Sequence, residues 1–313
     1  MPQPTPACFL ADDDTYAEWR ERKLAALPAS VEELIVEVRD PRRLTDAEHA
    51  ALLRRCRDAN MAIYAGRTGD DPDRAIPRRL GERFGLRQLD HNPGADDDAI
   101  TSIRVQSDRQ HAGYIPYTTR PIAWHTDGYY NPPDRRIGAF ILHCVQPAAE
   151  GGENALIDPE LLYLRLRDQS PAHIAALTRP DVMTIPPNLV DGIEQRPACP
   201  GPVFLTGADG RLAMRYTDRR RNIEWRDDAA TAEALVALRG QLAEPPTGQP
   251  GEQLTTKPGA QPAGSVLPRF TARLASGWGV LCNNVLHTRT AFRDDGAPRL
   301  LYRARYHERI AGS

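Results

Sequence analysis

The chain has 313 residues with a formal net charge of −2, and 41% of its residues are hydrophobic. This near-neutral balance excludes a strong electrostatic attraction to nucleic acid or to an anionic membrane surface, and no apolar run approaches the roughly 18 residues that span a bilayer. The N-terminus lacks a signal-peptide pattern and the five cysteines form no CxxC pair, which is typical of reduced thiols in a cytoplasmic protein.

The first third of the chain is predicted to mix helices and strands after a loose lead over residues 1–14. Apolar spacing predicts helices over 15–27, 45–60 and 73–84. Short β-rich runs predict strands over 33–38 and 61–64. Thr45 is followed by Glu48 three residues later, which is the spacing of a capping box and predicts where the second helix begins.

From residue 100 the pattern changes to short strands separated by turns, which indicates a sandwich or a barrel. Strands are predicted over 100–106, 138–145, 155–157, 203–206, 212–217, 270–274, 280–283 and 300–306. Helices are predicted between them over 158–167, 171–178 and 228–243. Residues 244–268 are rich in Pro and Gly and have no periodicity, which favours a disordered segment or a lid over the site.

Three residues have the chemistry of a metal site. His125 and Asp127 are two positions apart at the end of an extended segment, where side chains at i and i+2 share a face. With the distant His287 they make up two histidines and one carboxylate, the set that binds a ferrous ion on one side and leaves the other side open. Each of these residues also has a purely structural interpretation, such as a surface histidine or a strand-end histidine bonded to a carbonyl.

Three arginines follow near the C-terminus. Arg299, Arg303 and Arg305 lie two or four residues apart in a predicted strand, so their side chains point to one face. If that face is the protein interior, the guanidinium groups require an anionic partner that offsets their desolvation. A dicarboxylic co-substrate would provide one, because a guanidinium binds a carboxylate through two parallel hydrogen bonds.

Four motifs occur in a fixed order: His-x-Asp at 125–127, Gly-Gly-Glu-Asn at 151–154, Asn-Asn-x-x-His-x-Arg-Thr-x-Phe at 283–292, and Arg-x-x-x-Arg at 299–303. In this order they resemble the taurine dioxygenase-like (TauD/TfdA) family of Fe(II)/2-oxoglutarate-dependent dioxygenases over roughly residues 100–310. The resemblance implies an α+β, mainly β fold with a double-stranded β-helix (jelly-roll) core and with N-terminal and inserted helices. We expect one domain over 1–313, in which residues 15–99 form a mixed α/β part.

The resemblance also implies roles for the residues. Fe(II) would be bound by His125, Asp127 and His287, and 2-oxoglutarate would pair its distal carboxylate with Arg299. Asn154 occupies the position where the family commonly has a threonine that bonds the same carboxylate. Residues expected next to the co-substrate or the substrate are Arg303, Arg104, Tyr129, Tyr130, Asn131 and Arg215.

The reaction implied is the use of O2 to convert 2-oxoglutarate to succinate and CO2, coupled to hydroxylation of a small, anionic or amino-acid-like substrate. The carboxylate at Asp127 argues against a halogenase, because halogenases of this type lack it. Nucleic acid and membranes are not expected as partners, and a homo-oligomer is left open. Three alternatives remain: a zinc hydrolase that uses the same three residues with an activated water, a non-catalytic jelly-roll binding module, and a purely structural β-sandwich, which would leave the ordered ligand set unexplained.

Overall fold

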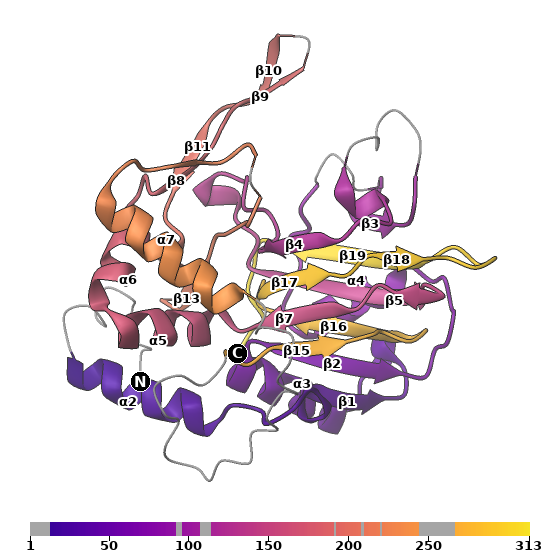
Figure 1. The fold of residues 1–313 in the computed structure, drawn as a ribbon. Helices are drawn as coiled ribbons and strands as arrows, with labels where there is room; N and C mark the ends of the chain where they lie inside the picture. The colour runs from indigo at the N-terminus through magenta and orange to yellow at the C-terminus, as the bar shows by residue number, and fades with distance from the viewer. Residues whose placement is uncertain are drawn as a thin grey trace.

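The computed structural model describes residues 13–91, 96–106, 114–190, 192–207, 210–219, 221–243 and 267–313 (Figure 1). This part of the chain combines helices with two main β-sheets, as expected for a mixed fold. Most of the predicted lead over 1–14 lies outside the described residues, and so does nearly all of segment 244–268. Its role as a lid therefore stays a prediction.

The N-terminal part contains the three predicted helices and two strands. The helices are α2 (Asp13–Ala25), α3 (Asp46–Ala59) and α4 (Ala75–Arg83). The strands are β1 (Ile35–Val38) and β2 (Met61–Gly66), which pair in parallel. The capping box is confirmed: the Thr45 hydroxyl accepts from the Glu48 N–H at 3.2 Å, and the Glu48 carboxylate accepts from the Thr45 N–H at 2.7 Å.

The larger sheet has six strands in the order β1-β2-β16-β5-β19-β3. Its other members are β3 (Ile100–Ile103), β5 (Ala139–Gln146), β16 (Trp278–Cys282) and β19 (Leu300–Tyr306). Apart from β1 and β2, all neighbours pair antiparallel. In β5 every residue but the last is buried, because α3 and α4 contribute apolar side chains on one face of the sheet and the smaller sheet packs on the other.

The smaller sheet has four strands in the order β15-β7-β17-β4. They are β4 (Ile122–His125), β7 (Asn154–Ile157), β15 (Phe270–Ala272) and β17 (Leu286–Arg289). Apolar residues of both sheets form one core between them, including Leu142, Leu156, Phe270 and Val280. This core sets the distance between the sheets, so it also determines which loops meet at their ends.

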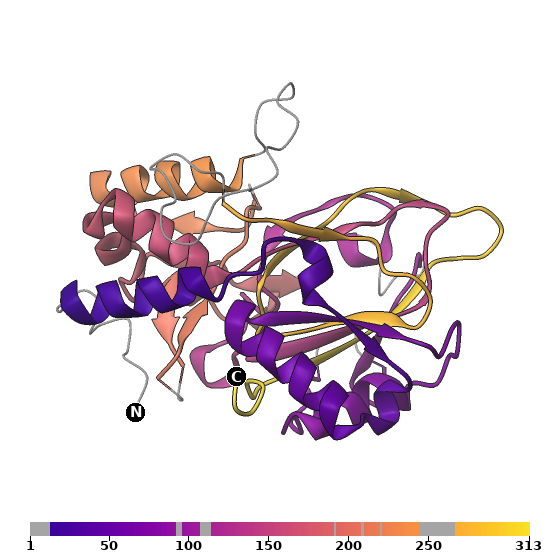
Figure 2. The same cartoon turned by 90° about the horizontal axis from the view of Figure 1, so that it is seen from below.

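A helical layer packs at one end of the sheets (Figure 2). Its members are α2, α5 (Pro159–Gln169), α6 (Pro171–Leu177) and α7 (Ala229–Leu242). Buried side chains of these helices form a separate apolar core with Tyr216 and Leu286. Leu286 comes from β17, so this core also packs against the strand that carries His287.

Several strands differ from the sequence-based expectations. The predicted hairpin is confirmed as β12 (Phe204–Thr206) paired with β13 (Leu212–Met214), although β13 ends three residues before the predicted end at 217. The predicted strands over 33–38 and 100–106 are shorter than expected, because the first begins in a 3-10 turn and β3 ends at Ile103. Strands that were not predicted are β6 (Glu150–Gly151), β8 (Met183–Ile185), β9 (Asn188–Val190), β10 (Ile193–Arg196), β11 (Cys199–Gly201), β14 (Glu224–Trp225), β17 and β18 (Phe292–Arg293). With two to four residues each, they are too short for a periodic pattern.

The described residues also bear on the expectations about cysteines and membranes. Four cysteines are buried free thiols, as predicted: Cys56, Cys144, Cys199 and Cys282. Among the described residues, no helix is both long and apolar enough to cross a membrane. The single domain and the oligomeric state stay predictions.

A buried histidine in the larger sheet gives this fold a testable pH dependence. His143 on β5 is fully buried, with Nδ1 3.0 Å from the Tyr64 hydroxyl and Nε2 without a hydrogen-bond partner in the described part of the chain. Burial lowers the pKa of His143 to about 4 from the ordinary 6.5. Because the unfolded chain binds this proton more readily, the free energy of unfolding should fall as the pH falls from 6.5 to 4, by about 3 kcal/mol in total from this residue.

A His143→Asn variant should show a smaller decrease in the free energy of unfolding between pH 7 and pH 4.5, measured by urea denaturation at both values. Asn places an amide atom where Nδ1 lies and does not titrate, so the pH slope is the informative quantity and the absolute stability is not. His49→Asn, on the outside of α3, serves as the control. Equal pH slopes for wild type and His143→Asn would show that His143 does not drive the acid sensitivity.

Candidate metal centre

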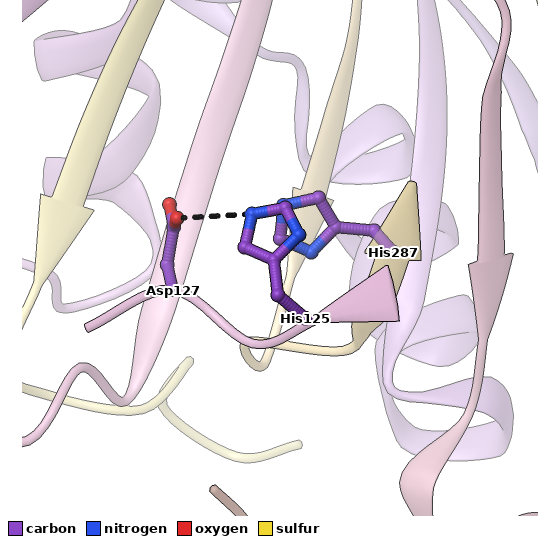
Figure 3. A group of neighbouring side chains, drawn as sticks. All are labelled: His125, Asp127 and His287. Atoms are coloured by element: carbon purple, nitrogen blue, oxygen red, sulfur yellow. Dashed lines mark ion pairs between the residues drawn. The ribbon is translucent and has the colours of Figure 1, made fainter. Parts of the chain in front are cut away.

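The three candidate ligands come together at one edge of the smaller sheet (Figure 3). His125 ends β4 and His287 lies in β17, and the two residues are directly opposite each other in the antiparallel pairing. Their rings are 4.1 Å apart between centroids, and His125 Nε2 lies 3.8 Å from Asp127 Oδ1. One ligand atom from each of the three residues lies within 4.8 Å of the others. This distance is short enough for a single ion to contact all three.

Both histidines are oriented by the same local hydrogen bond. The Nδ1 atom of His125 lies 3.0 Å from the Ala123 carbonyl, and the Nδ1 atom of His287 lies 3.0 Å from the Val285 carbonyl. A carbonyl can only accept, so each Nδ1 carries the proton and each Nε2 is left with a free lone pair. This arrangement fixes the tautomer that a metal requires.

The electrostatic environment favours the metal-binding form of all three residues. Burial, together with His287, lowers the pKa of His125 to about 3, and burial lowers the pKa of His287. Burial alone would raise the pKa of Asp127, but the charges of Arg303 and Arg305 outweigh it and hold the pKa below its ordinary value. At neutral pH the site therefore presents two neutral imidazoles and one carboxylate anion.

One atom of this cluster has no partner. Asp127 Oδ2 is buried and makes no hydrogen bond within the described part of the chain. An unpaired carboxylate oxygen inside a protein is unfavourable unless a cation occupies the space beside it. Two imidazole nitrogens and a carboxylate oxygen of Asp127 make a mixed nitrogen and oxygen donor set, which fits a ferrous ion.

Arg299 presents an unpaired cationic group in the interior. It lies just before β19, only 3% of its surface is exposed, and its Nη1 is buried without a hydrogen-bond partner among the described residues. Its guanidinium sits over the Phe292 ring, 5.0 Å from the centroid. Burial lowers the pKa of Arg299 to about 10, so the side chain is still charged at neutral pH. Such a group is suited to bind a carboxylate.

The turn before β7 lies against this arginine. Gly152 has a φ of +77°, and a Cβ added there would come within 3.3 Å of Arg299 Nε, so the position has little room for a side chain. Asn154, at the start of β7, is buried, and its Nδ2 makes only a long hydrogen bond of 3.5 Å to the Gly152 carbonyl. Its role in binding the co-substrate stays a prediction.

Arg303 and Arg305 point to the metal side of β19, as the alternation predicts. Arg303 Nη1 donates to Asp127 Oδ1 at 3.1 Å, so the described contact of Arg303 is with a candidate ligand. Arg305 forms an ion pair with the buried Asp90 and donates to the Tyr130 hydroxyl at 3.0 Å. The two arginines thus support the carboxylate and the loop that follows it.

The remaining predicted substrate residues have other partners in the structure. Arg215 uses each of its three nitrogens to donate to a backbone carbonyl, at 2.7 to 2.9 Å. Asn131 donates to the Arg135 carbonyl at 2.9 Å. Arg104 is exposed, and its charge is one of the influences on the pKa of Tyr302. The Tyr302 ring packs on the face of the sheet away from the metal side. These contacts give structural roles to the residues, and their contact with substrate stays a prediction.

Tyr129 is a predicted substrate residue that contacts an exposed arginine. Its hydroxyl accepts from Arg219 Nη1 at 3.1 Å, and Arg219 is exposed. Thr217 lies opposite His125 in an isolated bridge, and Arg219 follows Thr217 by two residues.

Sequence reasoning missed three residues near this site and the partner of a fourth. Asp90 and Arg219 carry no local signal, since their partners are more than 80 residues away along the chain. Asn284 stands inside the Asn-Asn-x-x-His motif, but its contact with Asp127 depends on long-range pairing. Arg305 was placed on the correct face, but its partner Asp90 could not be predicted.

Comparison with known proteins identifies the family of this chain. The family model described as "Taurine catabolism dioxygenase TauD, TfdA family" matches residues 23–247. A uridine-5′-phosphate dioxygenase from a Streptomyces species is 30% identical over 144 residues, which is 45% of this chain and 49% of that protein. One from an Amycolatopsis species is 28% identical over 204 residues, covering 60% of this chain and 70% of that protein. The chain thus matches about half the length of the first of these relatives.

Solved structures show the same fold. The non-heme iron oxygenase OrfP, determined in complex with Fe and alpha-ketoglutaric acid, superposes with a TM-score of 0.54 at 17% identity. The superposition covers 85% of this chain and 81% of OrfP. At this identity the similarity concerns the arrangement of helices and sheets.

Proposed function

The chain belongs to the TauD/TfdA family of taurine-catabolism dioxygenases, and from this we propose that it is an Fe(II)/2-oxoglutarate-dependent dioxygenase. Its metal ligands would be His125, Asp127 and His287. The observation that carries the proposal is the convergence of ligand atoms of these three side chains within 4.8 Å, with each Nδ1 bound to a carbonyl and Asp127 Oδ2 unpaired among the described residues. The two main sheets, packed over a shared apolar core, would be the two halves of a double-stranded β-helix.

The chain's own residues would hold the reactants in place. When bound, the ferrous ion and 2-oxoglutarate supply the oxidation, in which O2 is consumed and succinate, CO2 and a hydroxylated substrate are formed. Arg299 would bind the distal carboxylate of 2-oxoglutarate, which provides the partner that its buried guanidinium lacks. Asn154 would add an amide donor on the same side. His125, Asp127 and His287 occupy one side of the metal position, so the opposite side is left for the reactants.

For the substrate we propose a small anionic or amino-acid-like molecule. Arg219 and Tyr129 support this, because an exposed guanidinium and a hydroxyl contact each other close to Thr217, which pairs with His125. The two relatives named as uridine-5′-phosphate dioxygenases make uridine 5′-phosphate the first compound to test. Uridine without its phosphate is the matched control for recognition of the anionic group.

The test is substrate-dependent release of succinate from 2-oxoglutarate, with and without added Fe(II) and O2. The compounds to compare are uridine 5′-phosphate, uridine, amino acids, sulfonates and aryloxy acids. Under anaerobic conditions, addition of 2-oxoglutarate to the Fe(II)-loaded protein should produce a weak visible charge-transfer band. A protein that gives neither this band nor iron-dependent succinate would not be such a dioxygenase. Hydrolysis of a compound by the protein loaded with zinc alone would favour the zinc hydrolase.

A further inference from the structure

We propose that Asn284 is a positioning residue of the metal centre, which fixes the backbone of Asp127 so that its carboxylate stands opposite both histidines. The inference rests on the proposed metal site and goes beyond it, because Asn284 offers no ligand atom to the ion. In this role, Asn284 connects the loop that carries Asp127 to the segment that leads into His287.

The contacts of the Asn284 side chain are specific to the Asp127 backbone. Its Oδ1 accepts from the Asp127 N–H at 2.8 Å, and its Nδ2 donates to the Asp127 carbonyl at 3.0 Å. The same Nδ2 also donates to the Ile137 carbonyl at 2.9 Å. Both ends of one amide thus bind the donor and the acceptor of a single residue, as a neighbouring strand would. Asn284 is 7% exposed, so water cannot easily replace these bonds.

The position of Asn284 in the chain links two ligands. It lies between β16 and β17, three residues before His287, and has a left-handed φ of +50°. Asn adopts this conformation more readily than other residues with a side chain, apart from Asp. A shift of the turn at Asn284 would therefore move Asp127 and His287 relative to each other.

The loop on the other side of the contact is tightly packed. Gly128, which follows Asp127, has a φ of +65°, and a Cβ added there would come within 2.4 Å of Ile137 Cγ1. Ile137 supplies the second of the two carbonyls to which Asn284 donates. Asp127 is therefore followed by a position that only glycine fits, and Asn284 binds the carbonyl of the residue that packs against this glycine.

The carboxylate itself is restrained from a second direction. Arg303 Nη1 binds Asp127 Oδ1 at 3.1 Å, while Oδ2 has no partner among the described residues. With the backbone held by Asn284 and Oδ1 held by Arg303, Asp127 presents one free oxygen. A carboxylate that offers a single oxygen occupies only one position around a metal, which preserves the open side needed for reactants.

The chain provides a closely matched control in the adjacent Asn283. It is also buried, at 6% exposure, and its side chain also makes three hydrogen bonds. These bonds are to Asn60 Oδ1 at 3.2 Å, to Ser313 Oγ at 2.9 Å and from the Ile310 N–H at 3.1 Å. Loss of Asn283 removes equivalent buried bonds without touching Asp127, so it reports the effect of general destabilisation.

The experiment compares Asn284→Gly with Asn283→Ala in the full-length protein. Glycine accepts the left-handed φ, so this variant removes the amide without straining the backbone. The affinity for Mn(II) is measured by titration of the metal-free protein, and the visible spectrum of the Co(II)-loaded protein reports the ligand geometry. We expect Asn284→Gly to weaken Mn(II) binding ~10- to 100-fold and to change the Co(II) spectrum. Asn283→Ala should stay within about twofold of wild type.

Unchanged Mn(II) affinity and an unchanged Co(II) spectrum in Asn284→Gly would overturn the proposal, as would an equal loss in Asn283→Ala. If the glycine variant does not fold, Asn284→Asp replaces it. Aspartate keeps the acceptor for the Asp127 N–H but lacks both amide donors, so the same weakening is expected. A wild-type protein that binds Mn(II) but forms no succinate would reject the dioxygenase function and leave the role of Asn284 intact.

Discussion

A His125→Ala variant is expected to lose metal binding and turnover together. The substitution removes one of two imidazoles whose Nε2 is aimed at the shared position, and leaves Asp127 and His287 as an incomplete set. Succinate formation should fall by on the order of 10³-fold or more, equivalent to several kcal/mol of transition-state stabilisation. The measurements are iron content by elemental analysis and succinate release at saturating 2-oxoglutarate.

The control for this substitution is a histidine outside the centre. His49 on α3 stacks on Phe84, with ring centroids 4.6 Å apart, and its Nε2 lies 3.1 Å from the Arg83 carbonyl. His49→Ala should retain iron and turnover. If His125→Ala kept its iron and its rate, the metal would have to be bound elsewhere, and the ligand assignment would be wrong.

An Arg299→Met variant is expected to lose affinity for 2-oxoglutarate and to keep the metal. Removal of one partner of a buried charged pair costs about 2–5 kcal/mol, so the KM for 2-oxoglutarate should rise by ~30-fold or more. The stability of the protein without 2-oxoglutarate should be unchanged or higher, because the substitution removes a buried charge that has no partner there. The thermal stabilisation that 2-oxoglutarate confers on wild type should be lost.

Arg293→Met is the matched control, because Arg293 is exposed and pairs with Glu150 at the surface. It should leave the KM and the 2-oxoglutarate-induced shift in Tm unchanged. An unaltered KM in Arg299→Met would contradict the assignment. The carboxylate would then have to bind another cation, and Arg303 would be the next residue to test.

The stability of the protein without 2-oxoglutarate distinguishes a binding arginine from a structural one. Arg289 is also a buried arginine of this region, but it donates to the carbonyls of Pro116, Thr118 and Arg120. Removal of Arg289 would leave buried carbonyls unpaired and should destabilise the protein even without 2-oxoglutarate. Arg299 makes no such bonds among the described residues, and for this reason a ligand is the partner we propose for it.

The local sequence determined the elements and the chemical types at the site. Period-3.6 spacing and a capping box located α3, and short apolar runs located β5 and β19, because these signals depend on neighbours within a few residues. The identity of the ligands followed from residue chemistry, since few combinations other than two histidines and a carboxylate suit a ferrous ion with open positions. The four ordered motifs identified the family, and the family model bore this out.

The tertiary structure decided how these residues meet. His125 and His287 are about half the chain apart, and only the antiparallel pairing of β4 with β17 sets them opposite each other. Three other features likewise depend on the packing of the sheets. They are the hydrogen bonds between Asn284 and the Asp127 backbone, the ion pair of Arg305 with Asp90, and the burial of Arg299 Nη1 without a partner among the described residues. The physical cause of these long-range contacts is the burial of apolar side chains between and around the two sheets. This burial sets the strand register, and it depends on the whole chain rather than on any local stretch.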